Sequence, residues 1–235
     1  MKISLIIPAH NEEGYLENCL EGAIRNMEDL FEIIVVDNAS TDKTAEVARK
    51  FPGVKVVHEA SKGLTKARQR GFLEARGEIL AYVDADTKMP LGWAKRVREM
   101  FEKDSKIVCV SGPYKYYDLS AIGNFLVWFY WHLGMIAYFF TGYMVVGGNF
   151  AARKDALQKI GGFDLNVSFY GEDTNIARRL HKVGKVKFKK SLFIPTSARR
   201  FHGEGIIVTA ARYILNFGSE VLIKRPLTKK YRDIR

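Results

Sequence analysis

Residues 79–86 read Ile79-Leu80-Ala81-Tyr82-Val83-Asp84-Ala85-Asp86, an apolar run that ends in two carboxylates one residue apart. A continuous apolar run of this length is typical of a strand that is buried on both faces of a parallel sheet. Mg²⁺ and Mn²⁺ prefer oxygen ligands and often take one or two carboxylates together with substrate phosphates. Asp84 and Asp86 are therefore candidate metal ligands, although an isolated pair of this kind is more often a solvated turn.

Strands and helices alternate on both sides of this stretch. Short apolar, β-branched runs predict further strands at 3–7, 32–36, 54–58 and 107–111. Apolar residues at helical spacing predict helices from about 12, over 40–50, 64–76 and 90–103. This alternation predicts an α/β fold with a mostly parallel central sheet and helices on both faces.

The second half of the chain is less regular. We expect strands over 144–153 and 186–193, and helices over 154–160, 174–183 and 205–222. No linker or change in composition separates this half from the first, so we expect a single domain over residues 1–222.

Polar turns follow three of the predicted strands, at 8–11, 37–40 and 84–86. Ligands of open α/β sheets bind at the carboxyl ends of the strands, so we expect these turns to meet in one site. Asp37, at the end of its strand, can accept a hydrogen bond from a nucleoside base or ribose. The alternative is that it merely caps its own turn.

The amino-acid composition indicates which classes of binding partner and which cellular compartment to expect. The 235 residues carry a formal net charge of +11, which implies an anionic partner. A nucleic-acid-binding protein is one alternative, but the aromatic residues gather in one apolar block and do not interleave with basic ones, so we expect no nucleic acid. Cys19 and Cys109 have no disulfide or metal spacing, which favours reduced thiols and a cytoplasmic protein.

Several short motifs occur in one order along the chain. They are Ile6-Ile7-Pro8-Ala9-His10-Asn11-Glu12, Val35-Val36-Asp37-Asn38-Ala39-Ser40-Thr41-Asp42, Lys62-Gly63 with Arg68, Val83-Asp84-Ala85-Asp86, Gly147-Gly148-Asn149 and Gly171-Glu172-Asp173. Together they resemble the inverting glycosyltransferase family 2, over about residues 3–200. The resemblance implies a GT-A fold, a nucleotide-sugar donor, most often a UDP-sugar, and a divalent metal, Mn²⁺ or Mg²⁺.

The resemblance also implies residue roles. The nucleoside pocket would be lined by Pro8, Ala9, Asn11 and Glu12, with Asp37 at the base, Lys62 and Arg68 near the base or diphosphate, and Asp84 at the ribose or metal. Asp86 would bind the metal, and Gly147, Gly148 and Asn149 would border the donor sugar and the acceptor. Asp173, with Glu172 beside it, would be the general base. From the residues alone, this acidic pair could equally favour a helix N-terminus.

Arg199 and Arg200 form a basic pair late in the chain, followed by His202. Paired guanidinium groups suit a diphosphate leaving group. His202 is a candidate third metal ligand or phosphate contact, with a surface histidine as the alternative. This segment departs from the Q-x-x-R-W pattern of processive synthases in the family, so we do not expect processive synthesis.

With these roles, we expect the domain to divide into a nucleotide-binding half, 1–112, and an acceptor and catalytic half, 113–222.

Residues 119–152 contain no acidic side chain, lysine or arginine. Their length would allow a membrane span, but a span would put the metal motif and Gly147 on opposite sides of the bilayer. The remaining interpretations are a buried helix or, over 119–146, a segment in the membrane interface, where Trp and Tyr are favoured. We favour the second interpretation.

The basic tail, 223–235, is either disordered or attracted to anionic lipid. With the apolar segment it suggests a polyprenyl or other lipid-linked acceptor and a peripheral protein on the inner face of the cell membrane. A membrane-bound scaffold that binds nucleotide without transferring sugar is the alternative.

Overall fold

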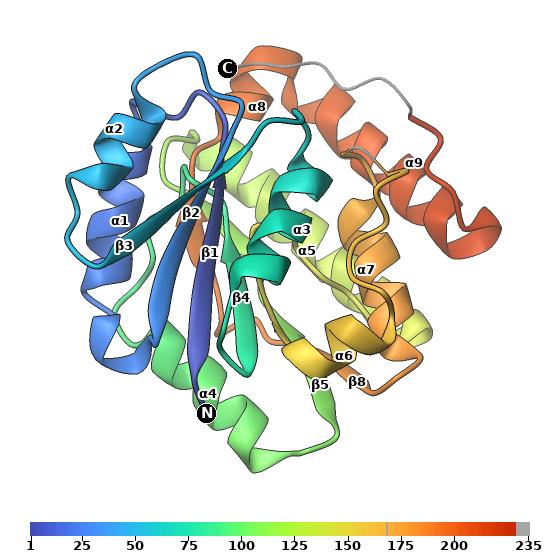
Figure 1. The fold of residues 1–235 in the computed structure, drawn as a ribbon. Helices are drawn as coiled ribbons and strands as arrows, with labels where there is room; N and C mark the ends of the chain where they lie inside the picture. Colours follow the sequence, from blue (N-terminus) through green and yellow to red (C-terminus); the bar gives the residue numbers. More distant parts are fainter. Residues whose placement is uncertain (168, 229–235) are drawn as a thin grey trace.

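Seven strands form one central sheet in the order β3-β2-β1-β4-β7-β5-β8 in the computed structural model, which describes residues 1–167 and 169–228 (Figure 1). The strands are β1 (Ile3–Ala9), β2 (Glu32–Asn38), β3 (Val54–Glu59), β4 (Ile79–Val83), β5 (Ile107–Ser111), β7 (Asn149–Arg153) and β8 (Lys185–Phe188). Only β7 runs antiparallel to its neighbours, β4 and β5. The predicted α/β fold with a mostly parallel sheet is confirmed.

Helices cover both faces of this sheet (Figure 1). They are α1 (Leu16–Ile24), α2 (Thr44–Arg49), α3 (Leu64–Glu74), α4 (Trp93–Lys103), α5 (Ala121–Thr141), α6 (Lys154–Lys159), α7 (Glu172–His181), α8 (Arg199–Glu204) and α9 (Ile206–Ile223), with a 3₁₀ turn, η1 (Met27–Asp29). Because side chains alternate along a strand, each central strand contributes side chains to two hydrophobic cores, one on each face of the sheet. Leu5 and Ile7 of β1 pack with α1, α2 and α4, whereas Ile6 packs with α3, α6 and α7.

The second half differs from expectation in three places. The strand expected over 144–153 begins only at Asn149, because the backbone at Gly147 and Gly148 turns close past other side chains. The strand expected over 186–193 ends at Phe188, and a separate short strand, β9 (Ile194–Thr196), pairs in parallel with β6 (Tyr114–Tyr116). The last helix is preceded by α8, and Gly205 joins the two with a φ of 83°.

The apolar segment forms α5, and most of its side chains are exposed. Gly123 and Val127 are its buried residues. The helix packs on the domain through Trp131, Met135 and Tyr138, which surround Phe188. The interpretation of this segment as a buried core helix is therefore wrong.

Candidate active site

The three polar turns meet at the carboxyl edge of the sheet, as the sequence predicts. The amide of Asn11 donates to Oγ of Ser40 (3.1 Å), and the amide of Thr41 donates to Oδ1 of Asn11 (2.8 Å). Glu12 donates its amide to Oγ1 of Thr44 (2.7 Å). Asn11 has a φ of 51°, a left-handed conformation that Asn tolerates better than most residues. These bonds lock the turns after β1 and β2 together.

Asp37 lies at the end of β2 and has two partners within the chain. Its carboxylate accepts from the amide of Ser40 (3.3 Å) and lies 3.3 Å from Nδ1 of His58. The side chain of Asn38 accepts from the amide of Gly63 (2.7 Å) and so fixes the loop that carries the exposed Lys62. Asp37 and Lys62 therefore lie on neighbouring segments at the same edge, as a nucleoside site requires.

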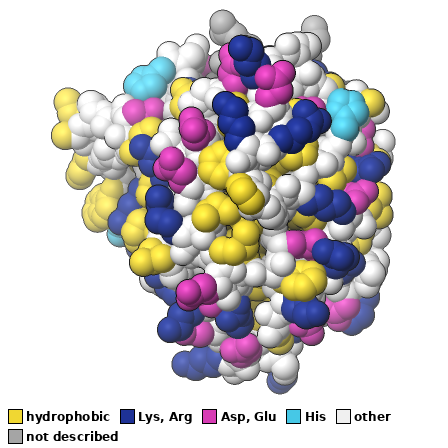
Figure 2. Space-filling view, turned by 60° about the vertical axis from the view of Figure 1, so that its left-hand side comes forward, with side chains coloured by type: hydrophobic (Ala, Val, Ile, Leu, Met, Phe, Trp, Pro, Cys, Tyr) yellow, Lys and Arg dark blue, Asp and Glu magenta, His cyan; other side chains and the backbone are white. Residues whose placement is uncertain are grey.

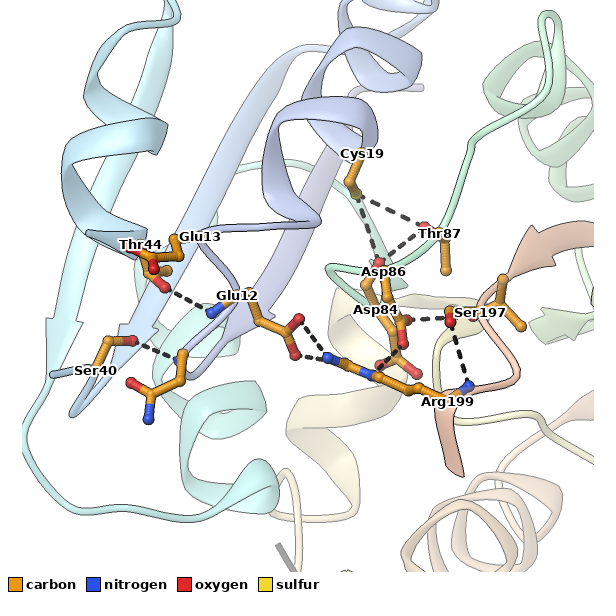
Figure 3. A network of polar contacts seen from close by, with 12 residues as sticks. Glu12, Glu13, Cys19, Ser40, Thr44, Asp84, Asp86, Thr87, Ser197 and Arg199 are labelled. Carbon is orange, nitrogen blue, oxygen red and sulfur yellow. Dashed lines mark hydrogen bonds and ion pairs between the residues drawn. The ribbon is translucent and has the colours of Figure 1, made fainter. Parts of the chain in front are cut away.

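Arg199 crosses the site from α8 to the metal motif (Figure 3). Its two terminal nitrogens donate to both carboxylate oxygens of Glu12 (2.6 and 2.8 Å). Its Nε lies 2.9 Å from Oδ2 of Asp86, and its guanidinium stacks over the ring of Tyr15. Burial alone would lower the pKa of Arg199, but the charges of Asp86 and Glu12 outweigh it and raise the pKa above its ordinary value, so Arg199 stays charged.

A second arginine, Arg68 of α3, is almost completely buried and joins the two acidic motifs. Its Nη1 lies 2.5 Å from Oε1 of Glu172, and its Nη2 lies 3.4 Å from Oδ1 of Asp84. Asp84 also accepts a hydrogen bond from the hydroxyl of Tyr114 (2.7 Å). Asp84 and Glu172, far apart in the sequence, thus share one buried cation.

Asp84 and Asp86 provide the donor set that a hard divalent cation prefers. Two carboxylates leave the remaining coordination positions to phosphate oxygens and water, as is usual for Mg²⁺ and Mn²⁺. Both side chains line a cavity at this edge of the sheet. Over the described ranges 1–167 and 169–228, no group of three or more His, Cys, Asp or Glu side chains is arranged to hold a metal. The residues fit a cation that arrives with further oxygen ligands from a diphosphate.

Glu172 and Asp173 begin α7 in different surroundings. Burial raises the pKa of Glu172 to about 7, opposed by the guanidinium of Arg68 and reinforced by Asp173. Burial also raises the pKa of Asp173 above its ordinary value, and hydrogen bonds from Thr174 oppose this. Oδ1 of Asp173 accepts from the amide of Thr174 (2.7 Å). Glu172 is held by Arg68, so Asp173 is the better placed of the two to accept a proton.

The glycine-rich turn places its backbone, and not the Asn149 side chain, against the cavity. Gly147 and Gly148 line the cavity. Asn149 is fully buried: its Oδ1 accepts from Trp93 Nε1 (3.2 Å), and its Nδ2 donates to the carbonyl of Leu192 (2.8 Å). The structure thus assigns the Asn149 side chain to holding the turn that presents the two glycines.

Arg200 and His202, on α8, have separate environments. Arg200 lines the cavity, and its Nη1 lies 3.4 Å from the hydroxyl of Tyr170 and from Oε1 of Glu204. His202 is exposed, with Nε2 3.3 Å from the carbonyl oxygen of Asp118. The described part of the chain does not bring His202 into a three-ligand group with the metal motif, so metal ligation by His202 stays a prediction.

One cavity of about 560 Å³ connects these groups to an apolar region. Its polar end contains Asp84, Asp86, Asp173, Arg199 and Arg200. Its apolar end is formed by α5, with Leu126, Phe129 and Leu133, and by α9, with Ile207, Ile214 and Phe217. The cavity can therefore take a molecule with one polar and one apolar end.

Sequence reasoning missed Tyr114 and Asp118. Tyr114 lies in β6, and its hydroxyl contacts Asp84. Asp118 accepts hydrogen bonds from Oγ of Ser197 (2.7 Å) and the amide of Ala198 (2.6 Å), and thereby fixes the start of α8. A three-residue strand has no readable period. The only available signal was the concentration of tyrosines at 114, 116 and 117.

The chain was compared with known proteins. The family model described as glycosyl transferase family 2 matches residues 4–161. The probable glycosyltransferase YdaM of Bacillus subtilis is 28% identical over 200 residues, covering 78% of this chain and 47% of YdaM. A dolichol-phosphate mannosyltransferase of Pyrococcus furiosus is 38% identical over 113 residues, covering 46% of this chain and 32% of that protein. The chain spans about half the length, or less, of these curated relatives.

Solved structures share the fold. The mannosyltransferase PcManGT of Pyrobaculum calidifontis, in complex with GDP-Man and Mn²⁺, aligns with a TM-score of 0.72 at 19% identity, covering 94% of this chain and 64% of that one. Glucosyl-3-phosphoglycerate synthase of Mycobacterium tuberculosis, with Mn²⁺, UDP-glucose and phosphoglyceric acid, aligns with a TM-score of 0.67 at 19% identity, covering 93% and 79%. These likenesses show a GT-A fold. With the family match over more than half of its residues, the chain belongs to glycosyl transferase family 2.

Proposed function

We propose that the chain is an inverting, metal-dependent glycosyltransferase that moves a sugar from a UDP-sugar to a lipid-linked acceptor at a membrane surface. One observation carries the proposal: a single cavity contains the acidic metal motif, Asp173, two arginines and an apolar end. Two fold neighbours were solved with a nucleoside diphosphate sugar and Mn²⁺, which supports this donor class. The preference for uracil rests on the sequence resemblance.

The residues present suit displacement at the anomeric carbon. Asp84 and Asp86 would hold the cation, which would neutralise charge on the departing diphosphate. Asp173 accepts the proton of the acceptor hydroxyl, whose oxygen bonds to the anomeric carbon from the face opposite the diphosphate. The bond to the diphosphate breaks, and its electron pair leaves with the nucleotide. Arg200 can add positive charge beside the leaving group.

Exposed apolar side chains on α5 and α9 support a membrane surface. More than half of the surface of each of the following is exposed: Ile122, Phe125, Trp128, Phe129, Ile136, Phe139 and Phe140 on α5, and Ile207, Val208, Ile214, Leu215 and Leu222 on α9. Such a collection is large for a soluble monomer and suits the interface of a bilayer. Because the same helices form the apolar end of the cavity, a lipid chain could enter from the membrane.

The contacts of the last helix, α9, with the rest of the domain favour a position on the membrane surface over a membrane span. Among the described residues, α9 is the one helix long and apolar enough to span a bilayer by length and composition. Its Arg212 lies 2.6 Å from Glu204, and its Glu220 lies 2.8 Å from Arg178. These ion pairs dock one face of α9 on the domain. We therefore propose peripheral attachment, at the inner face of the cell membrane.

Charge distribution gives the nucleic-acid alternative little support. On the face drawn in Figure 2, lysine and arginine side chains are scattered among acidic and hydrophobic ones. A protein that follows a nucleic-acid backbone needs a continuous basic track. The part of the basic tail from residue 229 onward lies outside the described residues.

A thermal-shift screen of nucleotide sugars, with and without Mn²⁺, tests the proposal. A UDP-sugar with Mn²⁺ should stabilise the protein most, since a ligand at 100 times its Kd adds about 2.7 kcal/mol. Asp86→Ala should lose the Mn²⁺-dependent shift, and Asp104→Ala, a carboxylate at the opposite edge of the sheet, should keep it. If no nucleotide sugar shifts the melting temperature, the proposal fails. Binding without donor hydrolysis or transfer would favour the scaffold alternative.

A further inference from the structure

Arg199 occupies the side of Asp86 that a metal ion would need. Its Nε lies 2.9 Å from Oδ2 of Asp86. The other oxygen of Asp86, Oδ1, accepts from Oγ1 of Thr196 (3.2 Å). Both oxygens of the main candidate ligand are therefore engaged by the protein itself.

The contacts that hold Arg199 there are strong and mostly desolvated. Its guanidinium binds both oxygens of Glu12, and the side chains of Glu12 and Arg199 are 1% and 18% exposed. Its amide donates to Oγ of Ser197 (3.2 Å), which fixes the start of α8 (Figure 3). Charge-assisted, bidentate contacts of this kind are stronger than ordinary hydrogen bonds.

A divalent cation at Asp86 would meet this guanidinium at close range. Two cations cannot share one carboxylate without strong repulsion in a partly buried site. A diphosphate changes the balance, because its oxygens can serve the metal and Arg199 at once. Arg199 is the first residue of α8 and has a long side chain, so a change of its side-chain torsions could take its guanidinium from Asp86 to a diphosphate oxygen without moving the helix.

We propose that Arg199 acts as a built-in counter-cation that makes metal binding conditional on the nucleotide. The inference rests on the proposed function. In it, Arg199 is a positioning residue that acts through Asp86. The metal binds weakly alone and tightly with the diphosphate. Because such coupling is reciprocal, the nucleotide gains the same factor from the metal.

The test measures Mn²⁺ binding directly, through the electron paramagnetic resonance signal of free Mn²⁺. The variant is Glu12→Gln with Arg199→Met, which removes the guanidinium without leaving Glu12 as an unpaired buried charge. It should bind Mn²⁺ alone about tenfold more tightly than the wild-type chain, within the usual range of coupling between sites. The ratio of Mn²⁺ affinities with and without UDP should shrink accordingly. Asp29→Asn with Arg98→Met removes a carboxylate–guanidinium pair (2.8 Å) outside the cavity and should leave binding of Mn²⁺ alone unchanged.

Equal affinity for Mn²⁺ alone in the wild-type chain and the double variant, with UDP-dependent Mn²⁺ binding intact in the wild type, overturns the inference and leaves the proposed function standing. Failure of the wild-type chain to bind Mn²⁺ even with UDP overturns the proposed metal dependence, and the inference with it. If the double variant does not melt cooperatively, Arg199→Lys replaces it. A lysine is a point charge that cannot bridge Glu12 and Asp86 with a fork, so Mn²⁺ alone should bind it severalfold more tightly than the wild type. No gain would contradict the inference.

Discussion

Glu172 and Asp173 are adjacent carboxylates with different surroundings. Both line the cavity, but Arg68 lies 2.5 Å from Glu172 and holds that carboxylate in place. Asp173→Asn keeps the shape of the side chain and removes the proton acceptor. Transfer to a hydroxyl acceptor should fall by about 10²–10⁴-fold, the usual contribution of a general base. Nucleotide affinity, measured by titration with UDP and Mn²⁺, should hardly change.

The pH dependence of transfer provides a second measurement on the same residue. Since burial raises the pKa of Asp173, the base loses its charge at a higher pH than an ordinary aspartate, whose pKa is 3.8. Transfer should therefore fall on acidification with a midpoint above that value. Asp173→Asn should lose this acidic limb. If Asp173→Asn kept both the wild-type transfer rate and the fall in rate at low pH, Asp173 would be a helix-terminal carboxylate without a role as general base.

Gly148 lies where no side chain fits. A Cβ atom on this residue would lie 2.1 Å from Cγ of Asp84 and 2.1 Å from the hydroxyl oxygen of Tyr114. Gly148→Ala should therefore displace Asp84 and abolish Mn²⁺-dependent nucleotide binding, measured by thermal shift. Gly218→Ala is the matched control, because a Cβ there meets nothing within 4 Å. Normal nucleotide binding by Gly148→Ala would show that Asp84 is not needed in its present position.

At the scale of elements, α9 is joined to α7 by a buried ion pair. Glu220 of α9 is 0% exposed and lies 2.8 Å from Nη2 of Arg178, and it accepts from Asn175 (3.0 Å). Since α7 begins with Glu172 and Asp173, this junction joins α9 to the helix that carries the candidate general base.

Glu220→Ala should destabilise the protein by about 3–5 kcal/mol, because it leaves the charge of Arg178 unpaired. Urea unfolding would measure the loss. Lys159→Ala is the control: it removes an exposed ion pair with Asp155 within α6 and should change stability by less than about 1 kcal/mol. A loss for Glu220→Ala as small as that of the control would mean that α9 is not docked through this pair.

At the scale of the whole molecule, the exposed apolar side chains of α5 and α9 and the net charge of +11 predict binding to anionic membranes. Phe139→Asp with Phe140→Asp, two residues that are 82% and 81% exposed, should weaken flotation with anionic liposomes. Leu73→Asp, at an exposed apolar position on α3, should not. Added salt should weaken binding further, because it screens the basic residues. If the wild-type protein does not bind liposomes, membrane attachment is contradicted. If it binds but the α5 changes have no effect, attachment through this face is contradicted.

Local sequence patterns were enough to predict most strands of the sheet and the edge at which the candidate site forms. Hydrophobic periodicity is a local property, and parallel strands bring their carboxyl ends to one edge, so the turns at Asn11, Asp37 and Asp84 could be placed together. The motif order was enough to indicate the family, which the family match over residues 4–161 shows. The roles of Asp173, His202 and the nucleoside residues stay predictions.

The ionic partners and the exposure of α5 depend on the tertiary fold and could not be predicted from local patterns. Arg199 and Glu12 are 187 positions apart, and no local pattern says which carboxylate a distant guanidinium will meet. The short strands β6 and β9, which bring Tyr114 to Asp84, are too brief to show a period. A helix that is apolar on all sides has the same sequence pattern in a core and in a lipid interface. Its place is decided by what packs against it, which depends on the whole fold.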